Sequence, residues 1–356
     1  MTDRKTLKTH ISKVEPGWIL GKDVCSDEGT VLLSHDTILT EYSLARLQEW
    51  NVDIVDVLLE GPCLEPFTKP APIYSNEDGV FLDMYERSIG TIANLFTEMK
   101  TSKMIPLQEF KPIAESVLGQ VLGVRGVLTR LRQVKSGDEY TFNHSLNVGI
   151  YSALIGSWMN YDETALRQLA MAGLLHDTGK AKISMDILGK PGPLTADEFE
   201  IMKRHSLLGY QMIKATAGIA YEVGMAVLQH HERENGTGYP LKLTSENITP
   251  FAKIIAVADA YDAITSDRIY KAKRTSYMAA DIIREEGFKT FDPMVVQSFL
   301  ERITASFYAD RVRLSNGMIG TIVSVNSERP TRPLIKTDQG FIDLDKIAEL
   351  NIIEIL

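Results

Sequence analysis

Residues 169–180 read LAMAGLLHDTGK, in which an apolar stretch with helical character is followed directly by a His-Asp dyad. The dyad is His176-Asp177, and Lys180 lies four residues after its histidine. A lysine behind a glycine is usually a solvated residue at a helix stop, but its place beside the dyad favours a shared site. The stretch therefore predicts a helix whose end carries polar side chains to a functional centre.

Five of the seven histidines fall within one predicted helical region, whereas His10 and His35 lie nearer the N-terminus. The five are His144, His176, His205, His230 and His231. His230-His231 ends a second apolar stretch, and Asp259 lies within the apolar segment that begins at Ile254. A carboxylate in such a buried helix is costly unless it is paired or binds a metal ion.

A single histidine of this kind is ordinarily a core residue that bonds a backbone carbonyl. A His-His pair, a His-Asp dyad and a buried aspartate in one helical domain instead indicate a metal site. Five imidazoles and two carboxylates exceed what one tetrahedral ion needs, and they suit two ions that share a bridge. Nitrogen and oxygen ligands without thiolate indicate a first-row metal such as iron, manganese or zinc. Two such ions about 3.5–4 Å apart activate a bridging water for in-line attack on phosphorus.

The order of these residues resembles the HD phosphohydrolase superfamily, with a lone histidine, an HD pair and a distant aspartate. Here they are His144, His176-Asp177 and Asp259. More specifically, HHERENGTGYP at 230–240 resembles the motif of HD-GYP domains. Supporting similarities are YTFNHS at 140–145, HDTGK at 176–180, KRH at 203–205 and DAYDAITSDR at 259–268. The resemblance covers residues 135–305.

This resemblance implies an all-helical domain that hydrolyses cyclic di-GMP, a bacterial second messenger, to pGpG and/or GMP by a metal-bridging hydroxide. The implied metal ligands are His144, His176, Asp177, His205, His230, His231 and Asp259. Asp177 would bridge the ions and act in catalysis together with Lys180. The implied substrate contacts are Lys180, Gly238, Tyr239, Pro240, Arg268 and Lys271.

Three positions depart from the family pattern. Some members have a glutamate that helps to hold a third metal at the position of Tyr140, so we expect two divalent first-row ions here, with iron or manganese favoured. Asn235 stands where many relatives have aspartate. Lys271 replaces an arginine, which keeps the positive charge but loses the bidentate geometry.

The predicted fold is mainly α, with a small α+β unit before the helical domain and a small β unit after it. The boundaries are 1–60 for the α+β unit, 61–79 for a proline-rich linker, 80–306 for the helical region and 307–356 for the β domain. In the last of these, Asn316-Gly317 between apolar stretches predicts a hairpin. The helical periodicity of Leu107–Val134 predicts one long helix, and both a dimer seam and a core-facing stripe fit it.

Charge and hydropathy restrict the partners. The formal net charge is −9, which argues against polymeric nucleic acid but allows a small anionic substrate. No apolar run approaches the length of a membrane span and the first residues are polar, so we expect a cytoplasmic protein without membrane insertion. Alternative functions are a catalytically silent cyclic-dinucleotide sensor or protein-docking module, or an HD phosphohydrolase for other nucleotides such as the mixed GMP–AMP cyclic dinucleotide. A homodimer is also compatible with the sequence.

Overall fold

A computed structural model describes residues 6–14, 18–25, 31–33, 52–58, 76–123, 126–134, 140–266, 275–326 and 331–356, with a few single positions between them. The chain divides into two compact units, Met1–Ile73 and Tyr74–Leu356. Among the described residues, no helix combines the length and the apolar character needed to span a bilayer.

The first unit contains two short antiparallel strand pairs. Strand β1 (Thr6–His10) pairs with β4 (Ile54–Leu58), and β2 (Val24–Cys25) pairs with β3 (Val31–Leu33). Its small core consists of Ile11, Val14, Leu20, Val24, Leu39, Leu47, Val55 and Val57. Most of the predicted linker lies outside the described residues, and helix α2 begins at Asn76, within the last residues assigned to that linker.

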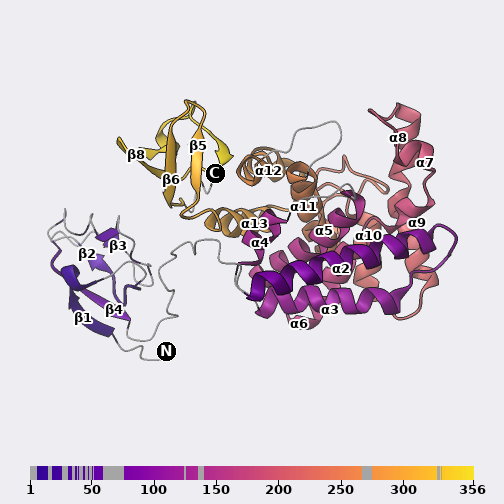
Figure 1. Cartoon of the computed structure of the whole chain (residues 1–356), viewed down its shortest axis with the longest axis horizontal. Coiled ribbons are helices and arrows are strands. Elements are labelled where there is room, and N and C mark those ends of the chain that lie inside the picture. The colour runs from indigo at the N-terminus through magenta and orange to yellow at the C-terminus, as the bar shows by residue number, and fades with distance from the viewer. Residues whose placement is uncertain are drawn as a thin grey trace. The chain divides into compact units, whose positions relative to one another are not determined.

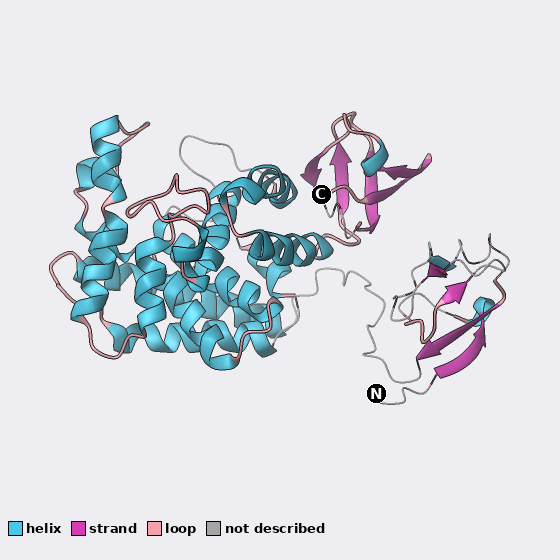
Figure 2. Cartoon of the chain, turned by 180° about the vertical axis from the view of Figure 1, so that it is seen from behind, coloured by secondary structure: helices cyan, strands magenta, loops and turns pink. Residues whose placement is uncertain are grey.

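The second unit is mainly helical, as predicted (Figures 1 and 2). Its helices are α2 (Asn76–Met99), α3 (Leu107–Gly123), α4 (Val127–Gln133), α5 (Tyr140–Trp158), α6 (Glu163–Leu175), α7 (Met185–Leu188), α8 (Ala196–Lys203), α9 (His205–Ala215), α10 (Tyr221–Gln229), α11 (Pro250–Thr265), α12 (Ser276–Thr290) and α13 (Pro293–Ala305). The short 3-10 turns η2 (Thr178–Lys182) and η3 (Ser245–Asn247) connect some of them.

Two glycines bring α5 and α6 close together. A Cβ atom added to Gly173 would lie 2.6 Å from the Cα atom of Gly149, so only glycine permits this backbone approach. Helix α11 packs against α5 as well, and the residues Ile254, Ile255 and Val257 are fully buried. The contact therefore places the start of α5, the end of α6 and the middle of α11 around one point.

The long helix predicted for Leu107–Val134 is wrong, because this segment forms α3 and α4. Helix α3 ends at Gly123, and Gly126 has a left-handed φ of +82° just before α4 begins. Ile113 and Val117 are buried in the main core, where α3 packs on α5 and α6. The apolar residues therefore form a core-facing stripe.

A five-stranded antiparallel sheet ends the chain, in the order β8-β7-β6-β5-β9. The strands are β5 (Arg311–Leu314), β6 (Ile319–Ser324), β7 (Leu334–Thr337), β8 (Gly340–Asp343) and β9 (Ile352–Ile355), with the 3-10 turn η4 (Leu344–Lys346). The predicted hairpin at Asn316-Gly317 is confirmed, and Gly317 has a φ of +84°. The sheet belongs to the same compact unit as the helices, and its apolar residues join their core.

Candidate metal centre

The seven predicted ligands converge, although they come from distant parts of the chain. They form two groups, and within each group the donor atoms lie within 4.8 Å of one another. One contains Asp177, His205, His230 and His231, and the other contains His144, His176 and Asp259. His144 comes from α5 and Asp259 from α11, whereas the remaining five lie at or just beyond helix ends.

Three of the histidines are oriented by the backbone. The Nδ1 atoms of His176, His205 and His230 lie 2.7, 2.8 and 2.8 Å from the carbonyl oxygen three residues earlier. A carbonyl only accepts hydrogen bonds, so each Nδ1 must donate a proton. Each Nε2 therefore points a lone pair into the cluster, as in histidines that bind metal ions.

The cluster contains polar atoms that protein partners leave unsatisfied. The Nε2 atoms of His205 and His230 lie 3.3 Å apart, and both carry a lone pair because both Nδ1 atoms donate elsewhere. Among the described residues, His176 Nε2 and Asp177 Oδ1 are buried without a hydrogen-bond partner. Such groups are costly in a protein interior unless a cation satisfies them. The residues fit a divalent metal site, and their donor set is typical of first-row metals.

Asp177 lies between the two groups. Its Oδ1 is 3.3 Å from His205 Nε2, and its Oδ2 is 3.3 Å from His176 Nε2 and 3.7 Å from His144 Nε2. Asp259 has a similar place at the other edge, with Oδ1 at 3.1 Å from His144 Nε2 and Oδ2 at 3.8 Å from His231 Nδ1. The two carboxylates therefore join ligands of both groups.

The electrostatics favour the ionised form of Asp177 and the neutral forms of His230 and His231. Burial opposes the ionisation of Asp177, but the charge of the adjacent Lys180 ammonium favours it, and the pKa of Asp177 is held well below the ordinary value. Burial and the neighbouring imidazoles lower the pKa of His230 well below 6.5, and burial also dominates the lowered pKa of His231. These histidines are therefore neutral at physiological pH and able to donate a lone pair.

His144 is oriented by a side chain for which the sequence predicted no role. Asp262 Oδ2 lies 2.7 Å from His144 Nδ1, and Asp262 Oδ1 accepts a hydrogen bond of 2.8 Å from Asn147 Nδ2. The Tyr85 hydroxyl donates to Asn147 Oδ1 over 2.6 Å. The only signal in the sequence was the position of Asp262, three residues after Asp259 and hence on the same helix face.

The loop that contains Gly238, Tyr239 and Pro240 lies against this cluster. The Tyr239 ring packs against His231 with centroids 4.6 Å apart and planes tilted by 34°, and the Tyr239–Pro240 peptide bond is cis. A Cβ on Gly238 would lie 2.4 Å from the Cα of Glu232, so this glycine is required for backbone packing. Glu232 in turn accepts hydrogen bonds from two backbone amides of the loop, a role that sequence reasoning missed.

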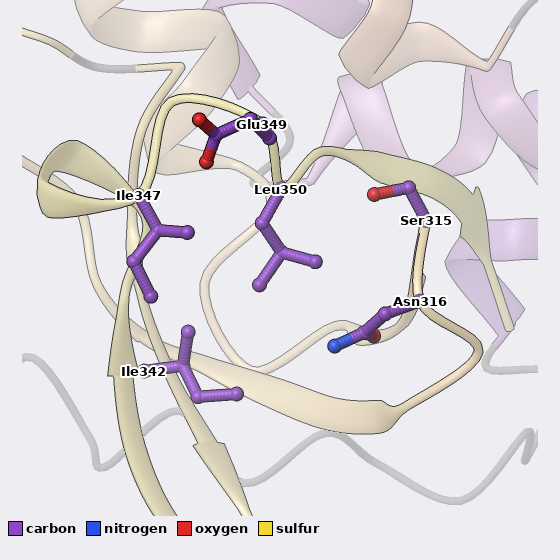
Figure 3. Close-up of a pocket in the computed structure, with 6 residues that line it drawn as sticks. All are labelled: Ser315, Asn316, Ile342, Ile347, Glu349 and Leu350. Atoms are coloured by element: carbon purple, nitrogen blue, oxygen red, sulfur yellow. The ribbon is translucent and has the colours of Figure 1, made fainter.

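The predicted phosphate contacts are only partly described. Lys180 is paired with Asp177, and its side chain is 23% exposed, so it lies at the open edge of the cluster. Arg268 and Lys271 lie outside the described residues. A separate hollow of about 390 Å³ lies at the C-terminal sheet, beside Ser315, Ile342 and Leu350 (Figure 3). It does not include any of the predicted site residues.

Comparisons with known proteins agree with this fold. Residues 131–295 match the model of the HD domain family. An HDG"Y"P protein from Bdellovibrio bacteriovorus has a similar structure, with a TM-score of 0.51 over 83% of this chain and 98% of that chain at 15% identity. The fold and cluster thus define an HD domain. Residues 131–295 thus belong to the HD domain family, and the motif at 230–240 within them resembles HD-GYP domains.

The similar curated proteins are longer than this chain. A cyclic di-GMP phosphodiesterase of Pseudomonas aeruginosa is 32% identical over 70% of this chain and 60% of its own length. A cyclic di-GMP phosphodiesterase of Thermotoga maritima is 36% identical over 54% of this chain and 52% of its own. The cyclic di-GMP phosphodiesterase response regulator of Xanthomonas campestris is 36% identical over 49% of this chain and 47% of its own length. The chain therefore spans about half to three fifths of these relatives.

Proposed function

We propose that this chain is a metal-dependent phosphodiesterase that opens cyclic di-GMP to pGpG and/or GMP. The observation that carries the proposal is the place of Asp177, whose carboxylate joins the two groups of ligand atoms. The names of the similar proteins support the choice of substrate.

The seven clustered side chains would hold two divalent first-row ions, with iron or manganese favoured. When bound, such a pair polarises a phosphoryl oxygen and activates water for in-line attack. Asp177 would bridge the two positions, and the backbone-bonded histidines would keep the donor atoms aimed at them. The Lys180 ammonium would stabilise negative charge on the phosphate and assist the leaving oxygen. Tyr239 would pack against the substrate beside the cluster.

A second substrate is a mixed cyclic dinucleotide, because a 3'3'-cGAMP-specific phosphodiesterase of Vibrio cholerae is 30% identical over 53% of this chain. The alternatives outside this reaction are a silent cyclic-dinucleotide sensor or docking module and an HD phosphohydrolase for other nucleotides. The cytoplasmic location, the homodimer and the separate 307–356 domain stay predictions.

The test is a substrate panel with protein purified without oxygen or chelator and analysed for metal. We expect cyclic di-GMP to be linearised faster than the mixed GMP–AMP cyclic dinucleotide and faster than common nucleotides. Asp177→Ala should abolish turnover with the fold retained, whereas Asp186→Ala, at an exposed carboxylate of α7, should leave it unchanged. Tight binding without turnover by metal-loaded protein would instead favour the sensor, and turnover that survives Asp177→Ala would refute the assigned site.

A further inference from the structure

Helix α8 carries an exposed aromatic ring next to the metal centre. Phe199 is 48% exposed, whereas most described phenylalanines are buried in the cores. Its ring meets Tyr239 edge to face, with centroids 6.4 Å apart and an angle of 82°. Because Tyr239 itself packs against His231, Phe199 lies only two ring contacts from a predicted metal ligand.

A cation lies beside the same two rings. The Lys203 ammonium is 5.4 Å from the centroid of Phe199 and 5.8 Å from that of Tyr239. Its side chain is 24% exposed and its described ion-pair partner, Glu200, is 69% exposed. Water competes for this pairing at the largely exposed Glu200, so an anionic or electron-rich ligand can also approach Lys203.

Helix α8 is fixed in place at its start. Thr195 and Glu198 form a complete capping box, and Lys190 is paired with Glu198 across the preceding loop at 2.5 Å. Figures 1 and 2 show α7 and α8 projecting from one end of the helical region. The helix therefore presents Phe199 and Lys203 at a defined position beside the centre.

We propose that Phe199 and Lys203, together with Tyr239, form a platform for a purine base of the substrate. This inference rests on the proposed function and deepens it by assigning base recognition to α8. A base joined to phosphate through its sugar extends several ångströms beyond the reacting phosphorus. An exposed aromatic face stacks such a base, and a lysine donates to the N7 and O6 acceptors at the edge of guanine. Neither side chain is needed for chemistry at phosphorus.

Competition separates base recognition from the metal centre. Bis(4-nitrophenyl) phosphate contains no nucleobase, and its rings are joined directly to the phosphate, close to the reacting atom. We expect Phe199→Ala to change its hydrolysis much less than it changes inhibition by pGpG. The same change should raise the inhibition constant of pGpG about tenfold. Phe199→Tyr keeps an aromatic face and should restore tight inhibition by pGpG. Lys203→Met should weaken the binding of guanine-containing ligands more than that of adenine-containing ones.

The matched control is Phe288→Ala, because Phe288 is 47% exposed on α12, which carries none of the clustered ligands. This change should alter neither the hydrolysis of bis(4-nitrophenyl) phosphate nor the inhibition constant of pGpG. The platform is refuted if pGpG inhibits Phe199→Ala as strongly as wild type. It is also refuted if calorimetry detects no binding of cyclic di-GMP or pGpG to the metal-loaded wild type. Failure of the proposed function is a different result, in which wild type binds cyclic di-GMP but does not cleave it.

Discussion

His144 Nδ1 lies 2.7 Å from Asp262 Oδ2. This histidine is therefore oriented by a side-chain carboxylate, whereas three other histidines of the cluster are oriented by backbone carbonyls. The difference follows from position. His144 lies inside α5, where the preceding carbonyls are engaged in the helix, whereas His176 and His230 follow helix ends with free carbonyls. A histidine inside a helix therefore needs an acceptor from another element, and α11 supplies it.

Removing this acceptor should weaken metal binding. In Asp262→Ala the His144 ring loses its orientation, and we expect metal affinity to fall about 10–100-fold. Asp262→Asn keeps an acceptor oxygen and should lose less metal affinity. Tyr85→Phe should change metal affinity least, because Tyr85 lies at the outer end of the same chain of hydrogen bonds. Competition with a chromogenic chelator measures all three. Unchanged affinity in folded Asp262→Ala would show that Asp262 does not position His144.

Gly238 should tolerate no side chain. A Cβ there would lie 2.4–2.5 Å from three backbone atoms of residues 231–233, so Gly238→Ala should destabilise the protein by about 1–3 kcal/mol. Gly119→Ala is the control, because a Cβ at this exposed position of α3 meets nothing within 4 Å. It should stabilise by about 0.5–1 kcal/mol. Urea unfolding of both variants checks the signs, and equal stabilities would contradict the close approach.

Acid should destabilise the metal-free protein. Burial lowers the pKa of His230 and His231 well below 6.5, so the unfolded chain binds protons that the folded chain excludes. Stability should therefore fall as pH drops below about 6.5. His144 does not compensate in this range, because its pKa is raised to about 9 and its contribution is lost only as pH rises through that value.

Thermal unfolding of chelator-treated protein between pH 7 and pH 5 measures this effect. His230→Asn removes one of the histidines with a lowered pKa and should flatten the pH dependence of the unfolding temperature. The prediction fails if wild type and His230→Asn lose stability in parallel as pH falls.

Arg132 should anchor the start of the C-terminal sheet to the helices. Its guanidinium lies 3.0 Å from Asp310 Oδ2 and 3.2 Å from the carbonyl of Ser306, and it packs over the Phe307 ring. Arg132→Met removes the hydrogen bonds and should cost about 1.5–3 kcal/mol in urea unfolding. The exposed ion pairs of Arg167 make Arg167→Met a control with little expected change. A cost no larger than in that control would contradict the anchor.

The sequence predicted features that local patterns encode. The hairpin at Asn316-Gly317 was predicted correctly, because its signal lies within the two residues of the turn. The break before α4 was missed, since a helical apolar spacing continues across Gly126 and hides it. Phe199 and Asp262 escaped notice because their roles depend on neighbours from other helices.

The sequence by itself determined the kinds of donor atoms, the helical class and the order of the motifs, because each depends only on residue types and short spacings along the chain. Only the tertiary structure decided which carbonyl or carboxylate orients each imidazole, and that α8 brings Phe199 and Lys203 beside Tyr239. Those relationships depend on how helices pack through glycines such as Gly149 and Gly173. Packing joins residues far apart in the chain, and no local pattern specifies their distances.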